Sequence, residues 1–284
     1  MTVLDQLPGR IPHPVPSCIL RRTLASMNIH PTALIDPNAR LADGVCVRAY
    51  SIIGANVSIG AGTEVGPHAV IEGWTTIGCN NRIFPFTSIG YPPQDLKYSG
   101  GETHVAIGDH NVIRENVTIH RGTELGGGLT QVGSHNLIMA YSHIAHDCVI
   151  GNRVVMANAA TLGGHVHVED GAVVGGLAAV HQFVRIGTRA YIGGKSGVSQ
   201  DIPPFMLAKG YPCKLYGPNL VGLRRQGWDD GTITALKKAY RIIFRSNLTR
   251  EQALAKVRQD LPEIPPEVGI FLDFLEQSER GITH

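Results

Sequence analysis

The chain has 284 residues, a formal net charge of +2 at pH 7 and 43% hydrophobic residues. This length allows one large domain or two ordinary ones. The small net charge excludes the strong field of a nucleic-acid-binding or membrane-surface protein. No stretch approaches the roughly 18 apolar residues that a membrane-spanning helix needs, so none is predicted.

Residues 1–26 form a proline-containing leader that we expect to be disordered. The leader lacks the apolar segment of a secretory signal, so export is not indicated. Met27 is an alternative start site immediately before the patterned sequence. The chain contains five cysteines and no CxxC pair. The odd count and irregular spacing argue against a disulfide framework and favour a reducing, cytoplasmic location.

Residues 27–202 carry an aliphatic residue at every sixth position. The pattern is unbroken from Ile29 to Ile89, and after a displacement of one residue it runs from Val132 to Val198. Helix faces repeat near 3.6 residues and strands near 2, so neither explains a period of six. A hexapeptide repeat predicts a mainly β fold, a parallel β-helix in which coils stack on one another. The residue two positions before each aliphatic is usually small or β-branched, which fits a narrow interior. By this rule Cys148 is a buried core thiol.

Two interruptions, at residues 90–106 and 121–131, predict loops thrown out of the solenoid. Loops on a rigid scaffold often carry function. Asp95 and Lys97 lie in the first loop, where they could clamp a substrate or simply be a solvated loop tip. The three glycines 126–128 in the second loop are a weak signal that is explained equally well by a sharp turn.

Histidines cluster in the middle and late coils. We expect stacking of the coils to bring five of them to one face: His120, His143, His146, His165 and His181. A neutral histidine can accept a proton from a hydroxyl, and His146 is followed by Asp147. Ordinary wall residues are the alternative, which we favour for His135 and His167. A zinc site, as in gamma-class carbonic anhydrases, is a further alternative.

Residues 203–284 change to helical spacing, which predicts a small C-terminal helical domain. Thr249 and Gln252 form a capping box, and Pro265-Pro266 precedes a last helix. A helix over 232–246 would carry one basic face, which could dock an acidic protein or be merely solvated. Its residues are Lys237, Lys238, Arg241 and Arg245.

Several segments together resemble the acyl-carrier-protein-dependent UDP-N-acetylglucosamine O-acyltransferases, the family that catalyses the first step of lipid A biosynthesis. The resemblance covers residues 28 to about 280 in unbroken order. The matching segments are QDLKY (94–98), TIHRGT (118–123), GGGLT (126–130), HIAHDC (143–148), ATLGGHV (160–166), AVHQF (179–183) and SGVSQDIPPF (196–205).

The resemblance implies a left-handed β-helix, a homotrimer with active sites between subunits, and transfer of a 3-hydroxyacyl chain from acyl carrier protein to the 3-hydroxyl of UDP-N-acetylglucosamine. His146 would be the general base, Asp147 would orient it, and the Gly164 N–H would stabilise the oxyanion. It implies no cofactor and no metal. The implied substrate-binding residues are Asp95, Lys97, His120, His143, His165, Gly176, His181, Gln182, Tyr191, Gly194, Asn219 and Arg225.

Within this resemblance, Gly194 matches the position that measures acyl length. A glycine there favours a longer chain, whereas the bulky Tyr191 would shorten it. Val221 and Gln226 depart from some family members near the expected nucleotide pocket, where Arg224 and Arg225 are retained. A 3-amino sugar nucleotide is an alternative acceptor. The glucosamine N-acyltransferase branch is disfavoured because its members carry an additional N-terminal domain, and a non-catalytic scaffold is disfavoured by the intact motif set.

Overall fold

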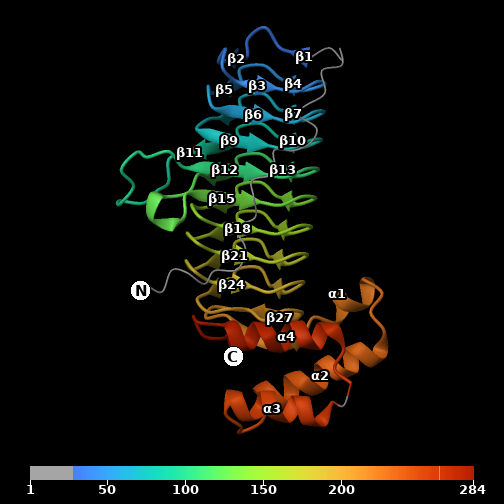
Figure 1. Cartoon of the computed structure of the whole chain (residues 1–284). Coiled ribbons are helices and arrows are strands. Elements are labelled where there is room, and N and C mark those ends of the chain that lie inside the picture. Colours follow the sequence, from blue (N-terminus) through green and yellow to red (C-terminus); the bar gives the residue numbers. More distant parts are fainter. Residues whose placement is uncertain (1–27, 262) are drawn as a thin grey trace.

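The structure, a computed structural model, describes residues 28–261 and 263–284. It is a tall stack of three-sided coils, and four helices follow the last coil (Figure 1). Each side of the stack is one sheet, and neighbouring strands come from successive coils. The leader expected over residues 1–26 lies outside the described residues.

The three sheets are named here A, B and C. Sheet A contains, in spatial order, β1 (Asn28–Ile29), β4 (Cys46–Val47), β7 (Glu64–Val65), β10 (Arg82–Ile83), β13 (Val112–Ile113), β16 (Leu137–Ile138), β19 (Val155–Met156), β22 (Val173–Val174), β25 (Tyr191–Ile192), β27 (Met206–Lys209) and β28 (Lys214–Pro218). Sheet B contains β2 (Leu34–Ile35), β5 (Ile52–Ile53), β8 (Val70–Ile71), β11 (Ser88–Tyr91), β14 (Thr118–His120), β17 (His143–Ile144), β20 (Thr161–Leu162), β23 (Ala179–Val180) and β26 (Gly197–Val198). Sheet C contains β3 (Arg40–Leu41), β6 (Val57–Ile59), β9 (Trp74–Ile77), β12 (His104–Ile107), β15 (Leu129–Val132), β18 (Val149–Ile150), β21 (His167–Val168) and β24 (Arg185–Ile186).

The register explains the period of six. Ile29 pairs with Val47, eighteen residues later, so one coil spends six residues on each of its three sides. The coil between Ile83 and Ile113 is thirty residues long, a whole number of hexads, and the phase is kept. The coil between Ile113 and Ile138 is twenty-five residues long, one more than a whole number, which accounts for the displaced phase.

Both predicted loops are present, but they are shorter than predicted. The first runs between β11 and β12, and the second between β14 and β15 contains a 3₁₀ turn, η2 (Glu124–Gly126). The loops are shorter because residues at the ends of the predicted ranges belong to strands. Strand β12, for example, pairs along its full length with β9 and β15. Both loops project from the same side of the stack (Figure 1).

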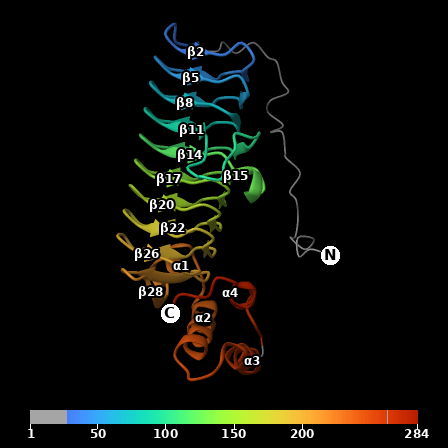
Figure 2. The same cartoon turned by 90° about the vertical axis from the view of Figure 1, so that its left-hand side faces the viewer.

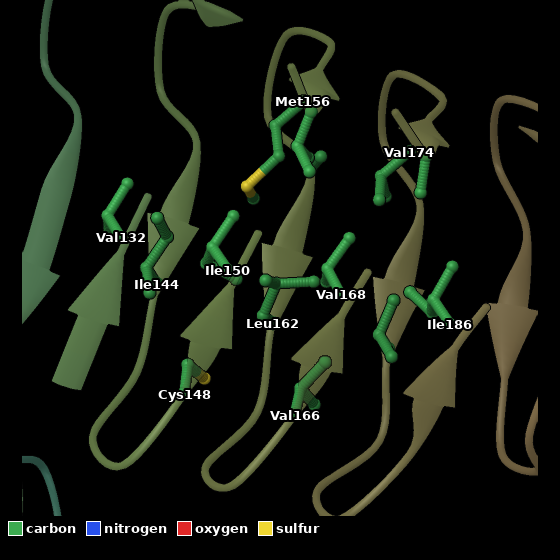
Figure 3. Close-up of a cluster of buried hydrophobic side chains, with 14 of the residues drawn as sticks. Val132, Ile144, Cys148, Ile150, Met156, Leu162, Val166, Val168, Val174 and Ile186 are labelled. Carbon is green, nitrogen blue, oxygen red and sulfur yellow. The ribbon is translucent and has the colours of Figure 1, made fainter. Parts of the chain in front are cut away.

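The core is one column of aliphatic side chains inside the coils. Ile144, Met156 and Leu162 have no solvent exposure, and Figure 3 shows such residues meeting from three sides. Each buried aliphatic contributes about 1.5–3 kcal/mol, so the column alone can stabilise the solenoid. Cys148 lies in this column, and its burial raises the pKa of its thiol to about 12.

The C-terminal part contains α1 (Leu220–Arg225), α2 (Asp230–Phe244), α3 (Arg250–Asp260) and α4 (Pro266–Gln277). Helix α1 lies beside the last coils, and the other three helices lie beyond them (Figure 2). The capping box at Thr249 and the proline start of α4 are confirmed. Helix α2 begins two residues earlier than predicted, since Asp229 caps it. Within residues 203–284, where a helical domain was expected, β27 and β28 precede the helices and form an antiparallel hairpin that extends sheet A. In the part of the chain that the structure describes, no helix has the length and apolar character to span a membrane.

Candidate active site

The site lies at the corner where the chain passes from sheet B to sheet C, the corner that also extrudes both loops. Asp147, His165 and Phe183 occupy this corner in three successive coils, each with a positive φ, of 58°, 61° and 66°. Backbone hydrogen bonds join the coils here, from His165 N to His146 O at 3.0 Å and from Phe183 N to Gly164 O at 3.0 Å. The rigid stacking therefore sets the side chains of this corner one above another.

His146 and Asp147 form a hydrogen-bonded dyad at its centre. His146 Nδ1 lies 2.8 Å from Asp147 Oδ2, and Asp147 is only 4% exposed. An ionised carboxylate can only accept, so the proton of the neutral imidazole resides on Nδ1 and Nε2 is left with its lone pair. That is the tautomer of a general base.

The second loop holds the carboxylate of this dyad. Thr123 donates its backbone N–H to Asp147 Oδ1 at 3.0 Å and its hydroxyl to Oδ2 at 2.7 Å. The backbone N–H of Asp147 in turn donates to Thr130 Oγ1 at 2.8 Å. A side chain at Gly126 would overlap the Asp147 carboxylate, so this glycine allows the loop to lie directly on the dyad. The glycine run 126–128 is thus explained by a close approach as well as by a turn.

Gly164 lies against the His146 ring. A Cβ atom at Gly164 would be 2.6 Å from Nε2 and 2.5 Å from Cε1 of His146, closer than real Cβ contacts come. The peptide group of this buried glycine is therefore adjacent to the free nitrogen of the base. Among the described residues, the Gly164 N–H has no protein acceptor. Such a donor can serve an oxyanion that forms beside the base.

Three further histidines surround the dyad and are kept neutral. His120 meets His143 edge-on with ring centroids 4.9 Å apart, and His165 meets His146 at 5.2 Å. Burial, followed by repulsion from His143 and His146, lowers the pKa of His120 to about 4. Burial and then His146 lower the pKa of His143. Burial also lowers the pKa of His165, against opposing effects of Asp147 and Asp95.

The first loop brings Asp95 to this group, since its charge acts on His165. Asp95 Oδ1 also accepts the backbone N–H of Lys97 at 3.0 Å, which shapes the loop tip. Arg121 fastens the loop by donating to Tyr98 Oη at 2.8 Å and to Gly90 O at 2.9 Å. Glu124 of the second loop accepts the Gly101 N–H at 2.7 Å. The two loops are therefore tied together over the dyad.

The sequence reasoning did not assign Arg121, Thr123 or Phe183, whose ring stacks on His165 at 4.4 Å. A signal for them existed, because all three lie in the quoted segments TIHRGT and AVHQF. The ligand atoms of His146, Asp147 and His165 lie within 4.8 Å of one another, a spacing that a metal ion could also use. The Asp147 carboxylate, however, already accepts three hydrogen bonds in total from Thr123 and His146.

Of the remaining predicted site residues, His181 and Gln182 share the corner of the dyad, and the others lie elsewhere on the chain. His181 and Gln182 are exposed one coil beyond Gly163. Gly176 and Gly194 lie on the corner between sheets A and B, where a Cβ on Gly194 would be 3.1 Å from Gly176 O. Tyr191, 38% exposed, is on β25 of sheet A.

Helix α1 carries the remaining predicted nucleotide-site residues. Asn219 accepts the Gly222 N–H at 3.2 Å and so caps α1, and Arg225 is in the last turn of the same helix. The two departures from the family pattern also map to this helix. Val221 is 63% exposed on it, and Gln226 is its C-cap.

Residues 129–164 match the family model of the bacterial transferase hexapeptide repeat, and residues 201–283 match that of the UDP-N-acetylglucosamine O-acyltransferase, domain 2. With the stacked hexapeptide coils and a histidine–aspartate dyad under two loops, these matches define the class: a left-handed β-helix acyltransferase of the hexapeptide-repeat type.

Curated and solved relatives narrow the class to one family. An acyl-carrier-protein–UDP-N-acetylglucosamine O-acyltransferase of Syntrophobacter fumaroxidans is 57% identical over 257 residues, which is 90% of this chain and 99% of the relative. One of Thermodesulfovibrio yellowstonii is 57% identical over 254 residues, covering 89% of this chain and 98% of the relative. The solved structure of LpxA from Acinetobacter baumannii superposes with a TM-score of 0.88 at 47% identity, covering 90% of this chain and 99% of that one. The chain belongs to the UDP-N-acetylglucosamine O-acyltransferase family.

Proposed function

We propose that the protein transfers a 3-hydroxyacyl chain from acyl carrier protein to the 3-hydroxyl of UDP-N-acetylglucosamine, the first step of lipid A biosynthesis. The observation that carries this is the dyad. His146 presents an unprotonated Nε2 beside the Gly164 peptide and is held from behind by Asp147. The names of the curated relatives supply the two substrates.

The chemistry follows from these positions. His146 Nε2 takes the proton of the sugar 3-hydroxyl as its oxygen attacks the thioester carbonyl. The Gly164 N–H stabilises the oxyanion of the tetrahedral intermediate, and Asp147 stabilises the imidazolium. The intermediate collapses by breaking the C–S bond, and the proton passes from His146 to the departing thiolate. This scheme uses no metal, no cofactor and no covalent enzyme intermediate.

The other residues bind the substrates in this proposal. The neutral imidazoles of His120, His143 and His165 would contact the sugar, and Asp95 and Lys97 would contact it from the first loop. The remaining contacts fall into two groups. The nucleotide would be held by His181, Gln182, Asn219 and Arg225. The acyl chain would be held by Gly176, Tyr191 and Gly194.

A homotrimer would bring these separated groups together, since the dyad and the Gly194 region lie on different corners of one protomer. Support comes from the corner between sheets A and B, where Tyr50, Phe86, Tyr141 and Leu177 are 57–66% exposed. Exposed apolar rows of this kind favour self-association. Light scattering coupled to gel filtration would measure the mass, and a monomer would contradict the trimer.

The basic face of α2 is the proposed dock for the acidic acyl carrier protein. Lys238 Nζ already donates to Asp260 O at 2.7 Å, and Arg245 donates to Tyr240 Oη at 3.1 Å. Lys237 and Arg241 form no ion pair within residues 28–261 and 263–284, so they would carry most of the attraction. We propose a cytoplasmic location, because carrier-bound acyl chains and sugar nucleotides are supplied there.

The deciding experiment incubates the full chain with UDP-N-acetylglucosamine and a panel of 3-hydroxyacyl carrier proteins, with products read by mass spectrometry. We expect an acylated sugar nucleotide, and the preferred chain length will show whether Gly194 or Tyr191 limits the groove. His146→Ala should abolish the product. His135→Ala, an exposed histidine stacked on His110 at another corner, should not. Product with only a 3-amino sugar nucleotide would replace the proposed acceptor.

A further inference from the structure

The chain that follows α4 is fastened across the last coil of the solenoid. Asp201, 1% exposed, accepts the Arg185 N–H at 2.8 Å and the Ser278 hydroxyl at 2.7 Å. Backbone hydrogen bonds run from Asp201 N to Gly281 O at 2.9 Å and from Thr283 N to Asp201 O at 3.0 Å. The tail is therefore held on both sides of residue 280.

Arg280 uses this fixed position to reach back into the wall of the solenoid. Its Nε donates to Ser199 O at 2.9 Å, and its Nη2 lies 2.7 Å from His181 Nδ1. Arg280 and His181 are 99 residues apart in the sequence. One guanidinium thus connects the C-terminal tail to a residue of the AVHQF segment.

The contact decides which nitrogen of His181 carries the proton. A guanidinium has donors only, so Nδ1 must accept, and the proton of the neutral ring resides on Nε2. Gln182 O lies 3.2 Å from the same Nδ1, and a hydrogen bond to it would need the opposite tautomer. The Arg280 contact is shorter and charge-assisted, so it prevails.

We infer that Arg280 is a positioning residue for substrate binding. It fixes His181 as the Nε2–H tautomer, which makes the open nitrogen a donor to an acceptor oxygen of the substrate, such as a phosphate or carbonyl oxygen. The inference rests on the proposed substrate contact of His181. Through Arg280, the C-terminal tail would contribute to the site, although Arg280 lies 134 residues after His146 in the sequence.

Two readouts test it on the full chain. The first is the ring ¹⁵N spectrum of histidine-labelled protein, with His181 assigned by the His181→Gln variant. We expect the Nε2–H pattern in the unmodified protein and a mixture of tautomers in Arg280→Met. Arg280→Lys, which keeps a donor, should restore the pattern in part. An unchanged spectrum in Arg280→Met would overturn the inference, whether or not the protein is active.

The second readout is a double-mutant cycle on KM. Arg280→Met should raise the KM of one substrate about tenfold with little change in kcat, as expected for loss of one charge-assisted hydrogen bond. The same change in the His181→Gln background should add nothing. A loss that persists in that background would show that Arg280 acts only through the fold. Arg258→Met removes an exposed arginine that pairs with Glu276 at 2.8 Å, and it should leave both readouts unchanged.

Discussion

At the scale of single residues, the dyad is held by short hydrogen bonds that leave its side chains little freedom to move. Asp147 is shared between His146 and the Thr123 backbone and hydroxyl, so its position is overdetermined. The surrounding imidazoles are neutral because they are buried and because they would repel one another if charged. A site of this kind would bind polar substrate groups by hydrogen bonds from neutral imidazoles, and these imidazoles place no positive charge next to the base.

The sharpest consequence concerns Gly164. In Gly164→Ala, the new methyl group would collide with the His146 ring at 2.5–2.6 Å and push it from its place. A displacement of this order lowers turnover by about 10²-fold even though the backbone N–H is retained. The kcat of acyl transfer measures this. Gly269→Ala is the control, because that helical glycine has open space around its Cβ position, so kcat should stay the same. Equal kcat values for both variants would contradict the proposed arrangement.

A second residue-scale prediction concerns stability and pH. The pKa of His120 is about 4 in the folded state, below its ordinary value of 6.5. The unfolded chain therefore binds more protons than the folded one between these values, and stability falls as the pH drops from 6.5 to 4. This residue accounts for about 3 kcal/mol at most of the loss. In His120→Asn the free energy of unfolding should depend less on pH in this window, and His135→Asn should keep the original slope. Identical slopes in the two variants would refute it.

At the scale of elements, the two loops act together to hold the residues around the dyad in place. The second loop fastens the dyad through Thr123, and the first brings Asp95 near His165. Arg121 joins them to the body, since it also lies over the ring of Trp74 on β9, 5.8 Å from its centroid. The loops leave from strands β11 and β14, which are neighbours in sheet B, so their closeness follows from the coil register.

Loss of this fastening should loosen the first loop without affecting the solenoid. We expect Arg121→Met to raise the KM for UDP-N-acetylglucosamine about tenfold, because the three hydrogen bonds that the guanidinium donates, two to Tyr98 Oη and one to Gly90 O, are lost. Limited proteolysis should then cut within residues 92–103, in the same variant, faster than in the unmodified protein. Arg114→Met is the matched control, as Arg114 is a wall residue paired with Glu115 at 2.9 Å. If the cleavage rate does not change, the loop is held by other contacts.

At the scale of the whole molecule, the repeat made the coils predictable and left the cross-coil pairs undetermined. The period fixed which side chains face inward, and even the displaced phase corresponds to the coil of twenty-five residues. It said nothing of Thr123 with Asp147 or Arg280 with His181, because those pairs depend on loop and tail conformations without a period. The hairpin β27–β28 was missed because its pairing with β25 is tertiary and leaves no hexad. The catalytic roles came from the family resemblance.

The same arrangement places α2 and the first coils at opposite ends of the chain's fold (Figure 1). Charge reversal at Lys237 and Arg241 together should weaken the encounter with an acidic carrier and raise the KM for acyl carrier protein about tenfold or more at low salt. The KM for UDP-N-acetylglucosamine should stay unchanged, because that substrate is bound elsewhere. Added salt should reduce the difference between variant and unmodified protein, since it screens exposed charges.

Arg40→Glu is the control for this experiment, because it reverses an exposed charge on β3 at the far end of the solenoid. An equal increase in the carrier-protein KM for Arg40→Glu would mean that the carrier responds only to net charge. No increase for the Lys237 and Arg241 variant would place the dock elsewhere. A rise confined to that variant ties carrier docking to the helices beyond the last coil. The C-terminal helices would then deliver the acyl chain, and the coils would provide the base that transfers it.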